Sequence, residues 1–284
     1  MLIRDQIIAF YQQKSPEFKP ELDSELQANI EQLKQEFAEV ASANVGGEFM
    51  DQEAIERIQA IAQRTWTRYL DNTLGLSPEE ERHLAEAGVT SVTPAVEQLL
   101  SDKTEHIVPH PNKIEFDPKF EIKMPVPEHL ANRGEVYNLC IQKGTLTAED
   151  RFKINEHIVG TIKMLERMPF PEELAKVPRY ASTHHETMKG TGYPRQLKGE
   201  ELSIPERIMA LADVFEALTA ADRPYKKAKC LSESLRIMRF MVLDEHLDKE
   251  VYQLFLDSKI YMAYAQQYLE PEQIDEIDIE EFRV

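Results

Sequence analysis

Hydrophobic and polar residues follow helical spacing over most of the chain, beginning with a stripe between residues 26 and 40. Its apolar members are separated by four and three residues in turn, and they are Leu26, Ile30, Leu33, Phe37 and Val40. This spacing predicts a helix with an apolar stripe two heptads long. The stripe can pack against the chain's own domain or against a partner helix in a coiled coil, and two heptads do not choose between these interpretations.

Two further helices are predicted before residue 88. The first covers residues 51–71, and its core-facing residues are Ile55, Ile58, Ile61 and Trp66. The second begins after Ser77, which is a suitable N-cap because Pro78 and three glutamates form the first turn.

The helical pattern dissolves between residues 88 and 133, where proline is frequent. Only residues 119–124, "KFEIKM", alternate in the manner of a strand. We therefore interpret residues 88–133 as an irregular connector. It separates an N-terminal helical region, residues 1–87, from a C-terminal region, residues 134–284.

Helical spacing returns at Thr147, an N-cap residue with Asp150 three positions later. The apolar face of this helix comprises Phe152, Ile154, Ile158, Ile162 and Leu165, and His157 lies beside it. More helices are predicted over residues 171–188, over residues 204–228 and in segments up to about residue 269. The fold class is therefore predicted to be all-α, a bundle of many helices.

Charge narrows the possible partners of this bundle. The chain of 284 residues carries a formal net charge of −18, which argues against general nucleic-acid binding and against anionic membranes. A small anion held by a metal or by a local basic cluster remains possible. The first residues lack the apolar core of a signal peptide, no apolar run has membrane-spanning length, and the two cysteines are far apart. This composition is typical of a cytoplasmic protein.

The stretch "HHETMKGTGYP", residues 184–194, concentrates the chemistry of the chain. His184, His185 and His157 carry imidazoles, and Asp213 carries a carboxylate that is expected to be buried, on or beside the apolar stripe of its helix. Imidazole and carboxylate together are ligands for iron, manganese or zinc. Each residue alone has a simpler interpretation, a hydrogen-bonded core histidine or an aspartate paired with a basic side chain. Their combination favours a metal site.

The residues after the histidine pair form a motif loop. Gly190 and Gly192 permit a tight turn, and Tyr193 with Pro194 fixes the direction in which the chain leaves it. Such a loop can admit a substrate close to the backbone, or it can be an ordinary surface turn. A basic cluster around Arg223 and Lys226 can bind phosphate or form a solvated helix face.

These motifs, in this order, resemble the signature of the HD-GYP family over roughly residues 134–270. That family comprises helical, metal-dependent phosphohydrolases, many of them cyclic di-GMP phosphodiesterases. The resemblance implies an HD-domain-like bundle in which His157, His184, His185 and Asp213 bind metal. It also implies that Arg223 and Lys226 face substrate phosphates and that Tyr193 belongs to the motif loop. The N-terminal helical region is similar to an insertion found in one subgroup of the family.

The chain departs from the family pattern at two points. No histidine is followed by aspartate, although the family is named for a His-Asp dyad, and Lys189 replaces a common acidic residue of the motif. The chain therefore resembles the C-terminal half of such a protein, without the half that carries the dyad.

Two functions follow from these observations. The first is a phosphohydrolase for a cyclic dinucleotide or another phosphodiester, truncated and weakly active or inactive alone, with a companion chain to supply the dyad. The second is a non-catalytic helical module that binds a signalling partner or self-associates. The expected cofactor is a divalent transition metal, iron or manganese, held as one ion or not at all.

Overall fold

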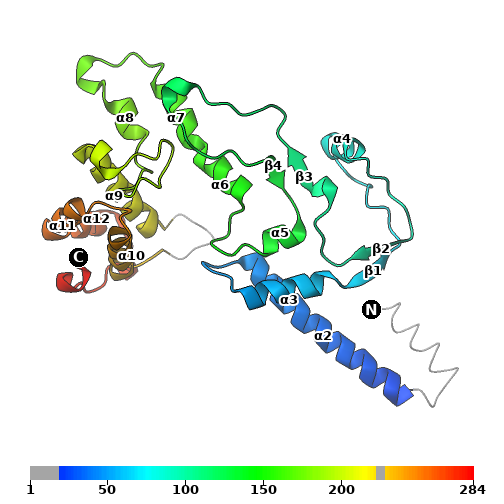
Figure 1. Ribbon diagram of the computed structural model, residues 1–284. Coiled ribbons are helices and arrows are strands. Elements are labelled where there is room, and N and C mark those ends of the chain that lie inside the picture. Colours follow the sequence, from blue (N-terminus) through cyan, green and yellow to red (C-terminus); the bar gives the residue numbers. More distant parts are fainter. Residues whose placement is uncertain (1–18, 222–227) are drawn as a thin grey trace. The chain divides into compact units, whose positions relative to one another are not determined.

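The computed structural model describes residues 19–221 and 228–284, with side chains from residue 23 onward (Figure 1). By contacts the chain divides into two compact units. The described part of the first consists of residues 19–111 and 128–150, and that of the second of residues 112–127, 151–221 and 228–284. The sequence analysis divided the chain into three consecutive domains, residues 1–87, 88–133 and 134–284, and that division remains a prediction.

The first unit combines helices with two short antiparallel strand pairs. Its helices are α2 (Lys19–Val45), α3 (Gln52–Ala62), α4 (Pro78–Glu86) and α5 (Glu135–Leu139). Strand β1 (Thr65–Arg68) pairs with β2 (Ala95–Gln98), and β3 (Ile107–Pro109) pairs with β4 (His129–Asn132). Helix α3 contacts both α2 and α5, and it buries Ile55, Ile58 and Ile61 as predicted.

Two features of this unit differ from what the spacing of apolar residues predicts. The predicted stripe lies on α2, but the Phe37 side chain is 73% exposed, so the described residues leave much of the stripe uncovered. The helix predicted over residues 51–71 ends at Ala62, and Trp66 lies on β1 instead. Threonine and tryptophan favour strands, and pairing with β2 outweighs the continued helical spacing.

The second unit is a helical bundle. Helix α6 (Ala148–Asn155) begins in the first unit and ends in the second. The other helices are α7 (His157–Leu165), α8 (Val177–Ala181), α9 (Ile204–Thr219), α10 (Leu231–Leu243), α11 (Lys249–Asp257) and α12 (Ile260–Tyr268). Thr147 and Asp150 form the predicted cap of α6, since the Asp150 amide donates to Thr147 Oγ1 at 3.1 Å.

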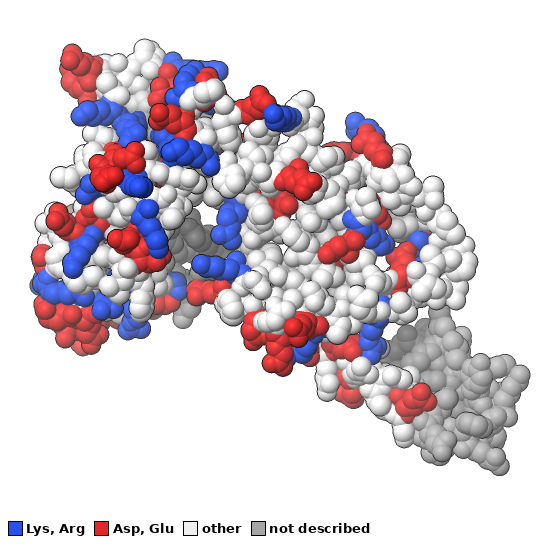
Figure 2. All heavy atoms as spheres, viewed as in Figure 1, with Lys and Arg blue, Asp and Glu red and all other residues white. Residues whose placement is uncertain are grey.

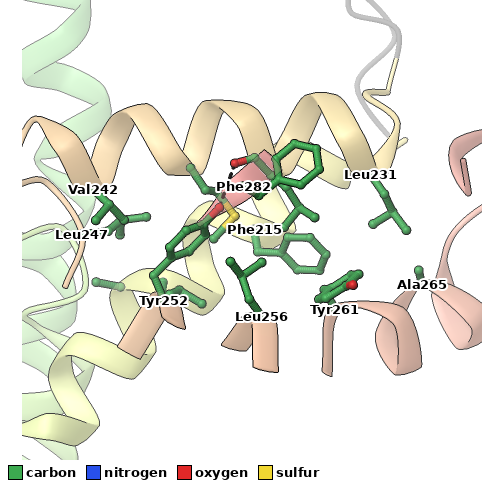
Figure 3. Packing of buried hydrophobic residues seen from close by; sticks show 13 residues of the cluster. Phe215, Leu231, Val242, Leu247, Tyr252, Leu256, Tyr261, Ala265 and Phe282 are labelled. Atoms are coloured by element: carbon green, nitrogen blue, oxygen red, sulfur yellow. Dashed lines mark hydrogen bonds between the residues drawn. The ribbon is translucent and has the colours of Figure 1, made fainter. Parts of the chain in front are cut away.

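The main core of this unit lies between α9, α10, α11 and α12 (Figure 3). Its buried residues include Phe215, Leu231, Leu235, Met238, Tyr252, Leu256 and Phe282. The Tyr252 hydroxyl, which lies inside this core, donates to the Leu235 carbonyl at 3.1 Å. The core holds α9 in place, and α9 carries Asp213.

A second, smaller core supports α7. Met124, Phe152, Ile158 and Val159 are buried there, and Tyr193 packs against them. Ile154 is 53% exposed, contrary to the prediction, because it lies two residues from Phe152 and so about 200° around the helix.

Residues 119–124 do not form the predicted strand. A 3-10 turn covers Pro118–Phe120, and Glu121 has a φ of +54°. The alternation instead buries Phe120 and Met124 while the segment runs beside the motif loop, where the Lys123 amide donates to the Pro194 carbonyl at 2.8 Å.

The all-α fold class is confirmed, because the strands of the described chain are confined to the two short pairs. No described helix combines the length and the apolar character needed to cross a lipid bilayer. Acidic and basic side chains are interspersed on the face shown in Figure 2, and no extended basic surface is visible among the described residues there.

Candidate metal centre

Three imidazoles of the second unit lie together. His157 begins α7, whereas His184 and His185 follow the C-terminal end of α8. One nitrogen from each of the three rings lies within 4.8 Å of the other two. The ring centroids of His184 and His185 are 4.1 Å apart, and those of His157 and His185 are 5.2 Å apart.

Hydrogen bonds to backbone carbonyls set the tautomers of two of these rings. His157 Nδ1 lies 2.6 Å from the Ile154 carbonyl, and His184 Nδ1 lies 2.9 Å from the Ala181 carbonyl. A carbonyl oxygen can only accept, so each Nδ1 carries a hydrogen, and in the neutral form of each ring Nε2 keeps a free lone pair. This is the arrangement in which protein histidines ligate metals through Nε2.

The ring of His185 faces Nε2 of His157. His185 Nε2 lies 3.3 Å from His157 Nε2, a pair of nitrogens that can share a proton or ligate one cation. Burial, followed by the neighbouring imidazoles of His184 and His157, lowers the pKa of His185 to about 4. His185 is therefore neutral near pH 7, which is the form that binds metal.

Asp213 lies beside this group without joining it. Its Oδ2 is 3.9 Å from His185 Nδ1, and the close set of ligand atoms consists of the three histidines. The Asp213 side chain is 42% exposed, so the expectation that it is buried was wrong. Leu211 and Phe215 define the buried face of α9, and Asp213 lies two positions from each, about 200° around the helix. Its role as a metal ligand remains a prediction.

The motif loop folds back onto His185. The Tyr193 ring stacks on the His185 ring with centroids 4.6 Å apart, and the Tyr193 amide donates to the His185 carbonyl at 3.1 Å. A Cβ on Gly192 would lie 2.4 Å from that carbonyl oxygen. Gly192 is therefore needed for the chain's own packing, while Gly190, with a φ of +78°, makes the turn. Pro194 follows through a cis peptide bond.

Glu186, which is adjacent to the histidine pair, turns away from it. Its side chain is 1% exposed, and its two oxygens accept hydrogen bonds from the amides of Arg195 at 2.7 Å and Leu197 at 2.9 Å. Arg195 is also buried, and it donates from Nε to the Phe120 carbonyl at 2.9 Å. Sequence analysis missed both residues, because nothing local shows that the partners of Glu186 are backbone amides.

A second network of hydrogen bonds holds the C-terminal end of α8, shortly before His184. Glu206 on α9 accepts from Arg179 Nε on α8 at 2.6 Å and from Thr183 Oγ1 at 3.0 Å. Burial raises the pKa of Glu206, but the hydrogen bonds from Ser203 and Thr183 outweigh it, so the pKa lies below its usual value. Glu206 thus ties the end of α8 to α9.

His246 is a further imidazole that sequence analysis missed. It is partly buried, and burial lowers its pKa. Its charge would in turn lower the pKa of His185, and its carbonyl accepts from the Met188 amide at 3.3 Å. The neighbouring Lys189 pairs with Asp244, whose Oδ1 is 3.4 Å from the lysine Nζ. The positive charge of Lys189 is thus partly neutralised.

Arg223 and Lys226, the residues predicted to bind phosphate, lie outside the described residues. Their position relative to the imidazoles remains a prediction from the sequence.

Comparisons with known proteins found one matching family model and several similar proteins. A model of the HD domain family matches residues 94–251. The chain is 38% identical over 113 residues to 3'3'-cGAMP-specific phosphodiesterase 1 of Vibrio cholerae, a match that covers 40% of this chain and 25% of that protein. It is 36% identical over 117 residues to a cyclic di-GMP phosphodiesterase of Thermotoga maritima, covering 41% and 31%. It is 32% identical over 134 residues to cyclic di-GMP phosphodiesterase PA4108 of Pseudomonas aeruginosa, covering 47% and 29%. The matches thus span roughly a quarter to a third of the length of these relatives.

Proposed function

The chain belongs to the HD domain family, and we propose that it is the metal-binding part of a phosphodiesterase that hydrolyses a cyclic dinucleotide or a related phosphodiester. The observation that carries this proposal is the convergence of one nitrogen each from His157, His184 and His185. The names of the relatives, phosphodiesterases of cyclic di-GMP and of 3'3'-cGAMP, support the substrate class.

A divalent transition metal fits the three imidazoles, because two of them present an Nε2 lone pair and the third is held neutral. We propose iron or manganese, bound as a single ion, with Asp213 as a candidate fourth ligand. When bound, such an ion lowers the pKa of coordinated water and stabilises negative charge on phosphoryl oxygens.

The chain's own side chains would bind and orient the substrate. Burial, followed by the charge of Asp213, raises the pKa of Tyr193 to about 12. The phenol therefore keeps its proton and can donate a hydrogen bond to a phosphate oxygen near His185. Arg223 and Lys226 would hold the other phosphate oxygens through charge-assisted hydrogen bonds.

We further propose that this chain alone has little or no hydrolytic activity. No histidine in its sequence precedes an aspartate, so the His-Asp dyad for which the resembling family is named is not among its residues. An ion with three or four protein ligands lacks the bridging groups that hold a reactive water against a second ion. A companion chain that supplies the missing pair would complete the centre.

A non-catalytic interaction module is the second candidate. It is favoured by exposed apolar side chains near His157, since Ile154 and Met164 are both more than half exposed. Such positions suit a covering partner, which could be a companion chain, a signalling protein or a second copy of this chain. In either case we propose that the protein is cytoplasmic, because the composition of the chain is typical of cytoplasmic proteins.

Metal-binding and hydrolysis assays together distinguish the two candidates. The purified chain, loaded anaerobically with ferrous iron or with manganese, would be incubated with cyclic di-GMP and with 3'3'-cGAMP. We expect metal to bind and turnover to be absent or very slow. Robust hydrolysis that is lost in His184→Ala would show that the chain is an autonomous enzyme, and absence of metal binding would favour the interaction module.

A further inference from the structure

The buried Glu186 carboxylate is placed to control the geometry of the histidine beside it. It follows His185 directly, yet both of its oxygens accept backbone amides nine and eleven residues further along the chain. Those amides, of Arg195 and Leu197, lie just beyond the motif loop. Glu186 therefore closes residues 186–197 into a loop whose two ends are held at one carboxylate.

Closing the loop determines what lies against the His185 ring. Within the closed loop, Gly192 lies against the His185 backbone and Tyr193 is hydrogen-bonded to the His185 carbonyl. The Tyr193 ring then stacks on His185 at an interplanar angle of 25°. One face of this imidazole is thus covered by a residue whose position depends on the loop.

Arg195 anchors the far end of the same loop. Its Nη1 donates to Ser182 Oγ at 2.8 Å, and its Nε donates to the Phe120 carbonyl. Ser182 lies at the end of α8, two residues before His184. The loop is therefore tied on one side to the histidine pair and on the other to residues 118–124.

We propose that Glu186 is a positioning residue for the metal site, which acts by holding Tyr193 against His185 rather than by binding the ion. This inference rests on the proposed function, because it assumes that His185 is a metal ligand. Both Glu186 oxygens already accept hydrogen bonds inside the protein, so neither is directed at the imidazoles. A glutamate is required because a carboxylate offers two acceptors, whereas glutamine would direct its amide group at one of the two backbone N–H groups.

Cobalt binding tests this role without an activity assay. Cobalt(II) would be titrated into the wild-type chain, into Glu186→Gln and into the matched control Glu200→Gln, whose exposed side chain lies just beyond the loop, on the 3-10 turn Gly199–Glu201. Visible absorption reports the affinity and the coordination of the ion. We expect affinity about 10-fold weaker in Glu186→Gln, the size typical of losing a group that orients a ligand. Glu200→Gln should match the wild type in affinity and in spectrum.

Nitrogen NMR of the metal-free chain gives a second readout. With ¹⁵N-labelled histidine, we expect the His185 ring signals to shift in Glu186→Gln while those of His83 in the first unit do not. Gly192→Ala should produce the same shift, because its Cβ would push the loop away from His185. If circular dichroism shows that Glu186→Gln does not fold, Gly192→Ala tests instead whether the loop positions His185.

The outcomes separate this inference from the proposed function. A folded Glu186→Gln chain with wild-type cobalt affinity and unchanged His185 signals would overturn the positioning role. Failure of the wild-type chain to bind cobalt would instead overturn the metal-site proposal, and the ¹⁵N spectra would still show whether Glu186 orients His185.

Discussion

At the scale of single residues, the backbone carbonyls that face the imidazoles decide their chemistry. His157 and His184 each use Nδ1 as a donor to a carbonyl three residues earlier. Each ring is thereby fixed with its Nδ1 facing a backbone carbonyl, and one nitrogen of each ring lies within 4.8 Å of one nitrogen of the other. Adjacent histidines in one regular helix could not converge in this way, and here they do so because the helix α8 has ended before His184.

Removal of one of these proposed ligands should lower the affinity of the chain for metal. We expect His184→Ala to weaken manganese binding by roughly 100-fold, at least as much as losing an outer partner of a ligand. Isothermal titration calorimetry measures the change. His129→Ala is the control, since His129 belongs to the first unit, where its Nε2 lies 3.9 Å from a Glu128 carboxylate oxygen. An equal loss in both variants would contradict the assignment of the site.

The sequence predicted the types of residue in the site better than their environments. His157, His184 and His185 stood out because several imidazoles together with a carboxylate favour a metal site, and the structure brings all three histidines together. The exposure of Asp213 could not be predicted, because the apolar neighbours in its sequence lie on other faces of α9. The burial of Glu186 depends on amides that come into reach only when the loop closes.

At the scale of elements, α9 and α10 form the support of the site. Leu235 on α10 is fully buried in the core that holds α9, whereas Phe240 on the same helix is 58% exposed. Leu235→Ala should therefore lower the free energy of unfolding by about 2–5 kcal/mol. Phe240→Ala should change it by only about 0.5 kcal/mol. Urea denaturation followed by circular dichroism measures both, and similar losses would show that the core is placed wrongly.

Helix predictions held where capping chemistry reinforced the spacing. Ser77 caps α4 through a capping box with Glu80, and Pro205 lies in the first turn of α9, so both helices begin where the sequence indicates. The segment 51–71 has no comparable signal at its end. The helix ends early because residues 65–68 pair with β2, a strand about thirty residues away, and local spacing cannot reveal such a partner.

The end of the chain is attached to α10 by a titratable group. Asp275 accepts hydrogen bonds from the amide and the hydroxyl of Ser232 in the first turn of α10. Burial alone would raise the pKa of Asp275, but these bonds outweigh it and hold the pKa below the usual 3.8. A lowered folded-state pKa gives stability that is present above the unfolded value and is lost as the pH falls through the folded one.

Asp275→Asn should therefore be less stable than the wild type at pH 7, and the difference should shrink below pH 3.8, as the wild-type carboxyl becomes protonated. Urea midpoints at pH 7 and at pH 3 measure this difference. Glu272→Gln, on an exposed carboxylate nearby, should show no such dependence. A difference that is equal at both pH values would mean that the ionised form of Asp275 contributes nothing to stability.

At the scale of the whole molecule, a chain this acidic could attract the proposed phosphodiester substrate only through local features. The net charge of −18 repels a phosphodiester at long range, and acidic groups are spread among basic ones on the visible face (Figure 2). A metal ion is the strongest local positive charge available to such a site. The charge of the bound metal, and hence the number of ions, should therefore decide whether the substrate binds.

The described ligands predict at most one ion per chain. Three imidazoles and Asp213 can fill three or four positions around a single ion, whereas two bridged ions need additional carboxylate or imidazole ligands. Among the described residues, the only group of three or more such side chains with converging ligand atoms is that of the three histidines. After anaerobic reconstitution and removal of free metal, inductively coupled plasma mass spectrometry should find one ion or fewer per chain. Two tightly held ions would show that ligands from elsewhere in the chain, or from a second copy, complete a larger centre, and the chain would then be expected to hydrolyse cyclic dinucleotides without a companion.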